Sequence, residues 1–225
     1  MDVDMDGDGE RELRERLVDA GVELVLEGGT ASVGLREIAR RAGVSHGAPR
    51  RYFPTHRALL SAIARRGFEE LGARAAAAVD GTAGAREELA ALARAYLAFA
   101  LERRGMFELM FRHELLDGGG QEEAPDGPRL REATLPLLRH VTGLVARCRG
   151  EAAEEPSAAV TATALWANLH GIAQLWSWGS LQLALGEPGE PGEPGEPGEP
   201  GDGGAGRPDQ LIDAALDAHL GPAPR

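Results

Sequence analysis

Residues 36–66 contain the side chains best suited to bind another molecule, because arginines are concentrated there. The window holds eight arginines against a single acid, Glu37, and carries a net charge of +7. The whole chain is acidic, at −12, so the remainder carries −19, which argues against a nonspecific coat for nucleic acid. A basic island on an acidic chain is typical of a surface that contacts DNA phosphates. The alternative is a solvated, arginine-rich helix face.

The first of two short helices predicted in this window is amphipathic, and a turn follows it. Its apolar residues recur at helical spacing and give one buried face: Leu35, Ile38, Ala39 and Ala42. Gly43 permits the turn. Ser45 is well suited to cap the next helix, because its hydroxyl can accept a hydrogen bond from a backbone N–H.

The second short helix, about residues 46–53, has almost no apolar face before Tyr52 and Phe53. It directs Arg50 and Arg51 outward. A helix too polar to be buried, held against its neighbour by a tight turn, is typical of a helix that reads DNA in the major groove. The pattern therefore predicts a helix-turn-helix.

Two weaker patterns could bind a metal, but neither is complete. One has the spacing of a calcium-binding loop: Asp4, Asp6, Asp8, Gly9 and Glu15. It lacks a preceding helix, and Arg11 stands where an apolar residue is usual. Residues 113–117 resemble a zinc-protease motif, with Asp117 in place of the second histidine ligand. Since no catalytic triad or phosphate loop occurs either, we expect no metal, no cofactor and no enzyme activity.

The remaining chain reads as successive helices without period-two alternation, so we expect an all-α fold. A stripe of Leu13, Leu17, Ala20 and Leu24 predicts a first helix that ends at Gly28. Thr55 can cap a long helix that follows it. Further helices are expected at 85–103, 106–116, 130–147, 158–185 and 210–220.

Composition predicts the domain organisation. Residues 1–9 are expected to form a disordered acidic tail, 10–56 the DNA-binding domain, and 57–225 a helical domain for effector binding and dimerisation. Five Glu-Pro-Gly triplets at 187–201 exclude helix, so we expect a flexible loop at 186–207. The acidic start is not typical of a signal peptide, no apolar run is long enough to span a membrane, and the single Cys148 excludes an internal disulfide. These features favour a cytoplasmic setting.

The helix-turn-helix stretch resembles the DNA-binding domain of the TetR family of bacterial transcriptional regulators. The resemblance runs from about residue 13 to 71 and includes the Ala-Gly-Val-Ser turn, Gly47 and the sequence Tyr52-Phe53-Pro54. It implies a three-helix head, a long fourth helix and an all-helical ligand-binding body. Arg50 replaces the usual tyrosine and His56 the usual lysine.

The resemblance implies which residues contact DNA. The recognition helix and its start would supply base contacts through Ser45, His46, Gly47, Arg50, Arg51 and Tyr52. Phosphates would be held by Arg36 and by Thr55 or His56.

A second resemblance concerns residues 166–172, where Trp166, His170 and Gly171 form a W-x3-H-G pattern. This pattern resembles the C-terminal domain of a TetR subgroup named for its Trp, His and Gly. It implies that this helix and the last one pack against their copies in a homodimer. His170 is then either a packed polar residue near the dimer seam or a ligand contact. Candidate pocket residues, each of which could instead be plain core, are Tyr96, Phe99, Phe107, Met110, Phe111, His113, Leu137, Trp166 and His170.

The sequence thus predicts a homodimeric DNA-binding regulator of transcription, more often a repressor, that a small-molecule effector releases from its operator. Its two recognition helices would enter successive major grooves about 34–36 Å apart. The alternative is a helical small-molecule-binding or interaction protein whose head recognises no specific operator.

Overall fold

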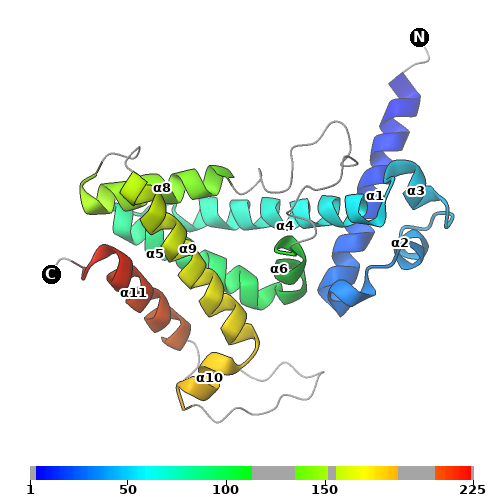
Figure 1. Ribbon diagram of the computed structural model, residues 1–225. Coiled ribbons are helices and arrows are strands. Elements are labelled where there is room, and N and C mark those ends of the chain that lie inside the picture. Colours follow the sequence, from blue (N-terminus) through cyan, green and yellow to red (C-terminus); the bar gives the residue numbers. More distant parts are fainter. Residues whose placement is uncertain (1–3, 113–134, 152–155, 187–205, 224–225) are drawn as a thin grey trace. The chain divides into compact units, whose positions relative to one another are not determined.

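The structure, a computed structural model, describes residues 4–112, 135–151, 156–186 and 206–223, and every regular element in these ranges is a helix (Figure 1). The all-α prediction is confirmed. Contacts divide the chain into two compact units. The first, called the head unit below, comprises 1–70 and 103–135, and the second, the body unit, comprises 71–102 and 136–225. The boundary expected at residue 56 concerns function and stays a prediction.

The head unit is built on helix α1 (Asp4–Gly28). The short elements η1 (Thr30–Ser32), α2 (Leu35–Arg41) and α3 (Ala48–Tyr52) follow it and contact it. Helix α4 (His56–Ala78) begins in this unit, and α6 (Arg104–Met110) returns to α1. Apolar side chains from α1, α2, α4 and α6 form most of the buried core: Leu17, Leu24, Ile38, Leu59, Ile63, Phe68, Met106 and Leu109.

Helices α1 and α6 approach so closely that a glycine is required between them. A Cβ atom at Gly105 would lie 2.7 Å from the carbonyl oxygen of Val25 and 3.0 Å from the Cα atom of Gly29. Both are backbone atoms, so neither can turn aside as a side chain could. Gly105 therefore sets the distance between the two helices.

Replacement of Gly105 by alanine is expected to destabilise the protein, because overpacking of this kind costs about 1–3 kcal/mol. For a chain of this size, each kcal/mol lowers the thermal midpoint by about 2–4 °C. Gly143→Ala is the matched control, since a Cβ atom there meets nothing within 4 Å and alanine favours the helix. Thermal unfolding followed by circular dichroism compares the two variants. Equal midpoints would mean that α6 can move away from α1 at little cost.

The body unit packs α5 (Ala85–Glu102) against α9 (Pro156–Ser177) and α11 (Gly206–Leu220) (Figure 1). It also contains α8 (Leu135–Arg149) and the short α10 (Ser180–Ala184). The buried core draws on every one of these helices except α10: Leu89, Leu92, Phe99, Leu144, Val145, Leu165, Ile212 and Leu216.

Ion pairs along α5 hold its neighbours in the body unit. Arg94 pairs with Asp209 at 3.0 Å and with Asp213 at 3.3 Å, both on α11. Glu88 accepts hydrogen bonds from His140 at 2.8 Å and from Arg147 at 3.0 Å, both on α8. Charged side chains at the rim thus add directional contacts to the apolar packing.

The N-terminus differs from the expectation, because α1 begins at Asp4 and includes residues of the tail expected to be disordered. Acidic residues favour the N-terminal end of a helix, where the helix dipole is positive. The first turns can therefore continue the helix that the apolar stripe from Leu13 onward secures by packing.

Three further helices end or begin elsewhere than predicted. Helix α6 stops at Met110, and residues 113–116 of the predicted helix lie outside the described residues. The single helix expected at 158–185 is two helices, because Gly179 adopts φ 75°, a left-handed conformation that ends α9 before α10 begins. Helix α11 begins at Gly206, within the loop expected at 186–207, while the Glu-Pro-Gly triplets lie outside the described residues.

Candidate nucleic-acid interface and ligand site

The turn between α2 and α3 is closed by backbone hydrogen bonds around a left-handed glycine. The N–H of Gly43 donates to Arg40 at 3.2 Å, and the N–H of Val44 donates to Ala39 at 3.0 Å. Gly43 has φ 69°, which a residue with a Cβ atom adopts only at a cost. The turn expected from the sequence is therefore present, and Gly43 has the expected role.

Helix α3 starts differently from the expectation. It spans Ala48–Tyr52, so it is shorter than the helix predicted at 46–53, and Gly47 is its N-cap. The predicted Ser45 side-chain cap is wrong. It is instead the backbone carbonyl of Ser45 that accepts a hydrogen bond, from the N–H of Ala48 at 2.9 Å.

The outward face of α2 and α3 carries the predicted DNA-contacting residues. Residues of the turn and of both helices are exposed: Arg36, Ser45, His46, Gly47, Arg50 and Arg51. Tyr52 is half-buried, and Pro49 is the buried residue of α3. Among the described residues, no ion pair engages Arg36, Arg50 or Arg51. Their guanidinium groups keep their donors for a ligand outside the chain.

Two residues at the start of α4 that were predicted to contact phosphate, Thr55 and His56, make hydrogen bonds within the chain. The hydroxyl of Thr55 accepts a hydrogen bond from the N–H of Ala58 at 3.0 Å, which confirms the predicted cap. The Nε2 atom of His56 lies 2.7 Å from the carbonyl oxygen of Val33. Because a carbonyl only accepts, this nitrogen must be the donor, and it ties the start of α4 to the segment before α2.

Several arginines of the basic island are paired with acids, mostly from α1. Arg41 donates to Glu27 at 2.6 and 2.7 Å and to Glu23 at 3.3 Å. Arg66 pairs with Glu15 and, at 3.7 Å, with Asp19. The hydrogen bonds with Glu27 and Glu23 raise the pKa of Arg41, and the hydrogen bond with Arg41 lowers the pKa of the Glu27 carboxyl group.

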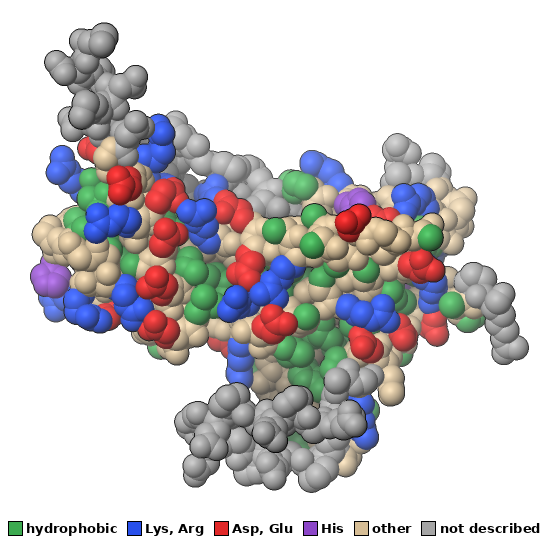
Figure 2. Space-filling view, turned by 180° about the vertical axis from the view of Figure 1, so that it is seen from behind, with side chains coloured by type: hydrophobic (Ala, Val, Ile, Leu, Met, Phe, Trp, Pro, Cys, Tyr) green, Lys and Arg blue, Asp and Glu red, His purple; other side chains and the backbone are tan. Residues whose placement is uncertain are grey.

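Arg40 is paired within α2 itself. Its Nε donates to Glu37 at 2.9 Å, and this hydrogen bond lowers the pKa of the Glu37 carboxyl group. On the face that Figure 2 shows, blue arginines and red carboxylates alternate over much of the molecule. The count of charges in residues 36–66 therefore overestimates the charge that DNA would meet. In the part of the chain that the structure describes, Arg36 of α2 and Arg50 and Arg51 of α3 are exposed and have no ion pair.

In the body unit, a histidine of α9 joins a buried tyrosine of α5. The hydroxyl of Tyr96 and the Nδ1 atom of His170 lie 2.8 Å apart, and the Trp166 ring lies 5.7 Å from the His170 ring. Burial lowers the pKa of His170 and raises the pKa of Tyr96. Both groups are therefore neutral near pH 7, and each has donor and acceptor capacity.

The predicted pocket residues are distributed over both units. Tyr96, Phe99, Leu137, Trp166 and His170 belong to the body unit, whereas Phe107, Met110 and Phe111 belong to the head unit. In the head unit, Phe111 contacts Phe107 with ring centroids 4.9 Å apart and Phe68 with centroids 5.7 Å apart. His113 lies outside the described residues.

The described residues show neither a metal site nor a membrane-spanning helix. No three His, Cys, Asp or Glu side chains there come together as a metal site. Among the helices described, none has both the length and the apolar character that crossing a membrane requires.

Two family profiles match the chain. Residues 17–63 match "Bacterial regulatory proteins, tetR family", and residues 89–191 match "Tetracyclin repressor-like, C-terminal domain". The chain belongs to the TetR family. The resemblance stated from the helix-turn-helix is thereby confirmed, and its subgroup stays a prediction.

Relatives within the TetR family are similar over part of their length. The HTH-type transcriptional repressor KstR of Rhodococcus jostii is 37% identical over 71 residues, which cover 32% of this chain and 34% of KstR. The HTH-type transcriptional regulator BetI of Rhizobium meliloti is 40% identical over 81 residues, 36% of this chain and 40% of BetI. The chain thus matches between a third and two fifths of the length of these relatives. They are regulators, not enzymes, in agreement with the prediction that this TetR-family chain is not an enzyme.

The fold extends over nearly the whole chain. A protein of unknown function from Rhodococcus sp. RHA1 has 29% sequence identity and a TM-score of 0.66. The comparison covers 92% of this chain and 93% of that one. The shared fold therefore includes the body unit as well as the helix-turn-helix.

Proposed function

We propose that this TetR-family chain is a sequence-specific DNA-binding regulator of transcription. The observation that carries the proposal is the exposed face of α2 and α3. There, Arg36, Arg50 and Arg51 have no ion pair among the described residues. In contrast, Arg40 and Arg41 of α2 and Arg66 of α4 are paired with carboxylates. Unpaired guanidinium groups on a short helix after a tight turn suit the major groove, where arginine binds guanine with two hydrogen bonds.

The contacts proposed with DNA divide by role. Bases are read by Arg50, Arg51 and Tyr52, with Ser45, His46 and Gly47 at the start of the helix. Arg36 holds a phosphate. Thr55 and His56 have their side chains engaged within the chain, so the start of α4 holds a phosphate mainly through backbone N–H groups.

The proposed regulator is a homodimer. Helix α9 contains no Asp, Glu, Lys or Arg, and it buries one face within the body unit. The opposite face is apolar and exposed: Val160 is 68% exposed, Leu175 39% and Trp178, just after the helix, 62%. Small residues lie between them, and a Cβ atom at Gly171 would meet nothing within 4 Å. Such a surface favours close packing against the same helix of a second copy, with α11 alongside.

Each copy would place one α3 in the major groove, and the grooves would lie about 34–36 Å apart on a near-palindromic site. We further propose that the regulator is a repressor that a small molecule releases. The body unit offers neutral polar groups at Tyr96 and His170 beside the Trp166 ring, which suits a ligand with an apolar surface and a hydrogen-bonding group. Binding there would shift the population away from the DNA-competent state.

Selection of genomic fragments by the purified protein, followed by titration of a selected and a random duplex across salt concentrations, tests the proposal. A regulator binds its selected site about 10³–10⁷-fold more tightly than random DNA. Equal affinity for the two duplexes would favour the alternative, a helical binding protein without an operator.

A further inference from the structure

Helix α1 contacts the helix-turn-helix through an arginine that the family resemblance gives no role. The Nη2 atom of Arg16 donates a hydrogen bond to the carbonyl oxygen of Ala42 at 2.7 Å. Ala42 is the C-cap of α2. The last carbonyl groups of a helix have no partner within it, so this bond satisfies one of them with a charged donor.

The same guanidinium group lies against the turn. Its Nη2 atom is 3.8 Å from the position of a Cβ atom at Gly43, the left-handed residue that reverses the chain between α2 and α3. The direction in which α3 leaves α2 depends on this turn. Arg16 thus contacts the point that sets the orientation of the recognition helix.

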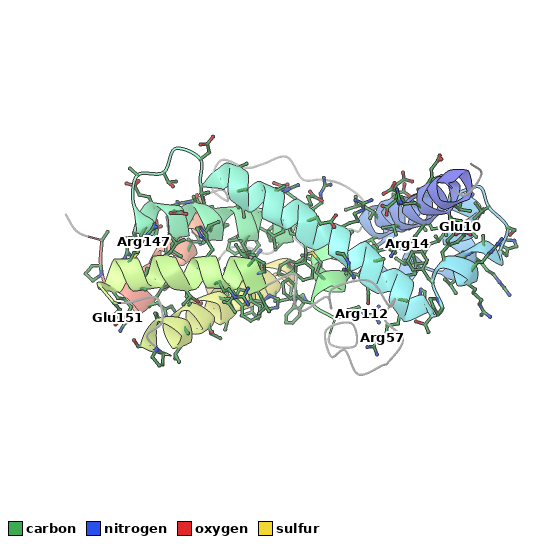
Figure 3. The ribbon with its side chains drawn as sticks, turned by 90° about the horizontal axis from the view of Figure 1, so that it is seen from above. Glu10, Arg14, Arg57, Arg112, Arg147 and Glu151 are labelled. Carbon is green, nitrogen blue, oxygen red and sulfur yellow. The ribbon has the colours of Figure 1, made fainter. Side chains whose placement is uncertain are left out.

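A second arginine of α1 contacts the other end of α3. The guanidinium carbon of Arg14 lies 5.0 Å from the centroid of the Phe53 ring. Phe53 is the C-cap of α3 and is buried, and Figure 3 labels Arg14 on α1. A cation over an aromatic face is attracted to it by the ring quadrupole.

Helix α3 needs support of this kind because it is short. It has five residues, and Pro49 is the buried one among them. A helix of this length is not stable alone, so its position depends on the groups that hold its two ends. Those groups include Arg16 before α3 and Arg14 after it.

We propose that Arg16 is a positioning residue for DNA recognition: by holding the Ala42 carbonyl, it fixes the orientation from which Arg50 and Arg51 reach the bases. The inference rests on the proposed function. It differs from a phosphate contact, because its effect is on base recognition and not on the number of phosphates neutralised.

The full-length Arg16→Ala variant tests this. We expect its affinity for the selected duplex to fall about 10-fold, the order expected when one base contact is displaced. Its affinity for random duplex and the salt dependence of that affinity should stay as in the unmodified protein, since each phosphate contact adds about 0.9 to the salt slope. Arg16→Lys should recover part of the loss, because an ammonium group can also donate to the carbonyl.

Arg139→Ala is the matched control, since it removes the same charge from an exposed position on α8. Arg139→Ala should change neither the affinity for the selected duplex nor the affinity for random duplex. Circular dichroism of each variant measures whether the protein keeps its helix content. If Arg16→Ala lowers the helix content, Arg16→Lys is used in its place to test the preference for the selected duplex.

Two results would overturn the inference. One is an unchanged preference of Arg16→Ala for the selected duplex. The other is an equal loss for both duplexes with a salt slope lower by about one unit, which would make Arg16 a phosphate contact. If the unmodified protein itself shows no preference, the proposed function fails and the inference fails with it.

Discussion

Replacement of Ala167 by glutamate is expected to separate the proposed dimer into monomers. Ala167 is exposed at the middle of the uncharged face of α9, between Val160 and Trp178. In a two-fold assembly, the two new carboxylates would be buried close to each other without partners. An unpaired buried charge costs several kcal/mol, and about 3 kcal/mol weakens association roughly 100-fold.

Light scattering or sedimentation at micromolar concentration measures the assembly. Ala77→Glu is a matched control, because it introduces the same charge at an exposed alanine of α4 and should leave the dimer intact. The monomeric variant should also lose affinity for a palindromic duplex, since each head then binds its half-site alone. A variant that remains dimeric would place the seam away from α9.

The features that the sequence predicted well depend on neighbours along the chain. Gly43 indicates a left-handed turn, and Thr55 indicates a cap, because each acts within a few residues of its own position. The buried positions of Leu17, Ala20 and Leu24 on α1 followed from helical spacing for the same reason. Local chemistry of this kind needs no knowledge of the fold.

The features that the sequence did not predict depend on distant partners. Arg66 pairs with Glu15 across 51 positions, and Tyr96 bonds His170 across 74. Counting charges in a window cannot reveal that a carboxylate outside the window neutralises one of its arginines. The hydrogen bond between His56 and the carbonyl oxygen of Val33, 23 positions away, was not predicted either, and the DNA contact of His56 stays a prediction.

Helix boundaries were uncertain where two local signals compete. Around Gly179, the apolar pattern favours one continuous helix, whereas the glycine favours a stop, and the structure has the stop. The helix expected to start at His46 starts at Ala48 instead. A turn precedes it, in which the carbonyl of Ser45 accepts a hydrogen bond from the N–H of Ala48. Such competition is decided by packing, which periodicity does not record.

Replacement of both Arg50 and Arg51 by alanine is expected to abolish specific operator binding while the protein stays folded. Both side chains are exposed on α3. Neither contributes to the core of the head unit, so thermal stability should change by no more than ~0.5 kcal/mol per site. Each bidentate contact with a base contributes about 1–3 kcal/mol, so the loss of two removes most of the preference over random DNA.

The double variant Arg40→Ala/Arg41→Ala provides the comparison, because it removes the same charge from arginines that are paired with acids. It frees the carboxylates of Glu37, Glu23 and Glu27, which should weaken binding to all duplexes alike by repulsion. The preference for the selected duplex should survive in this variant and disappear in the Arg50/Arg51 variant. If the two variants lost the same preference, base recognition would depend on total charge rather than on α3, and the recognition helix would have to be sought elsewhere in the chain.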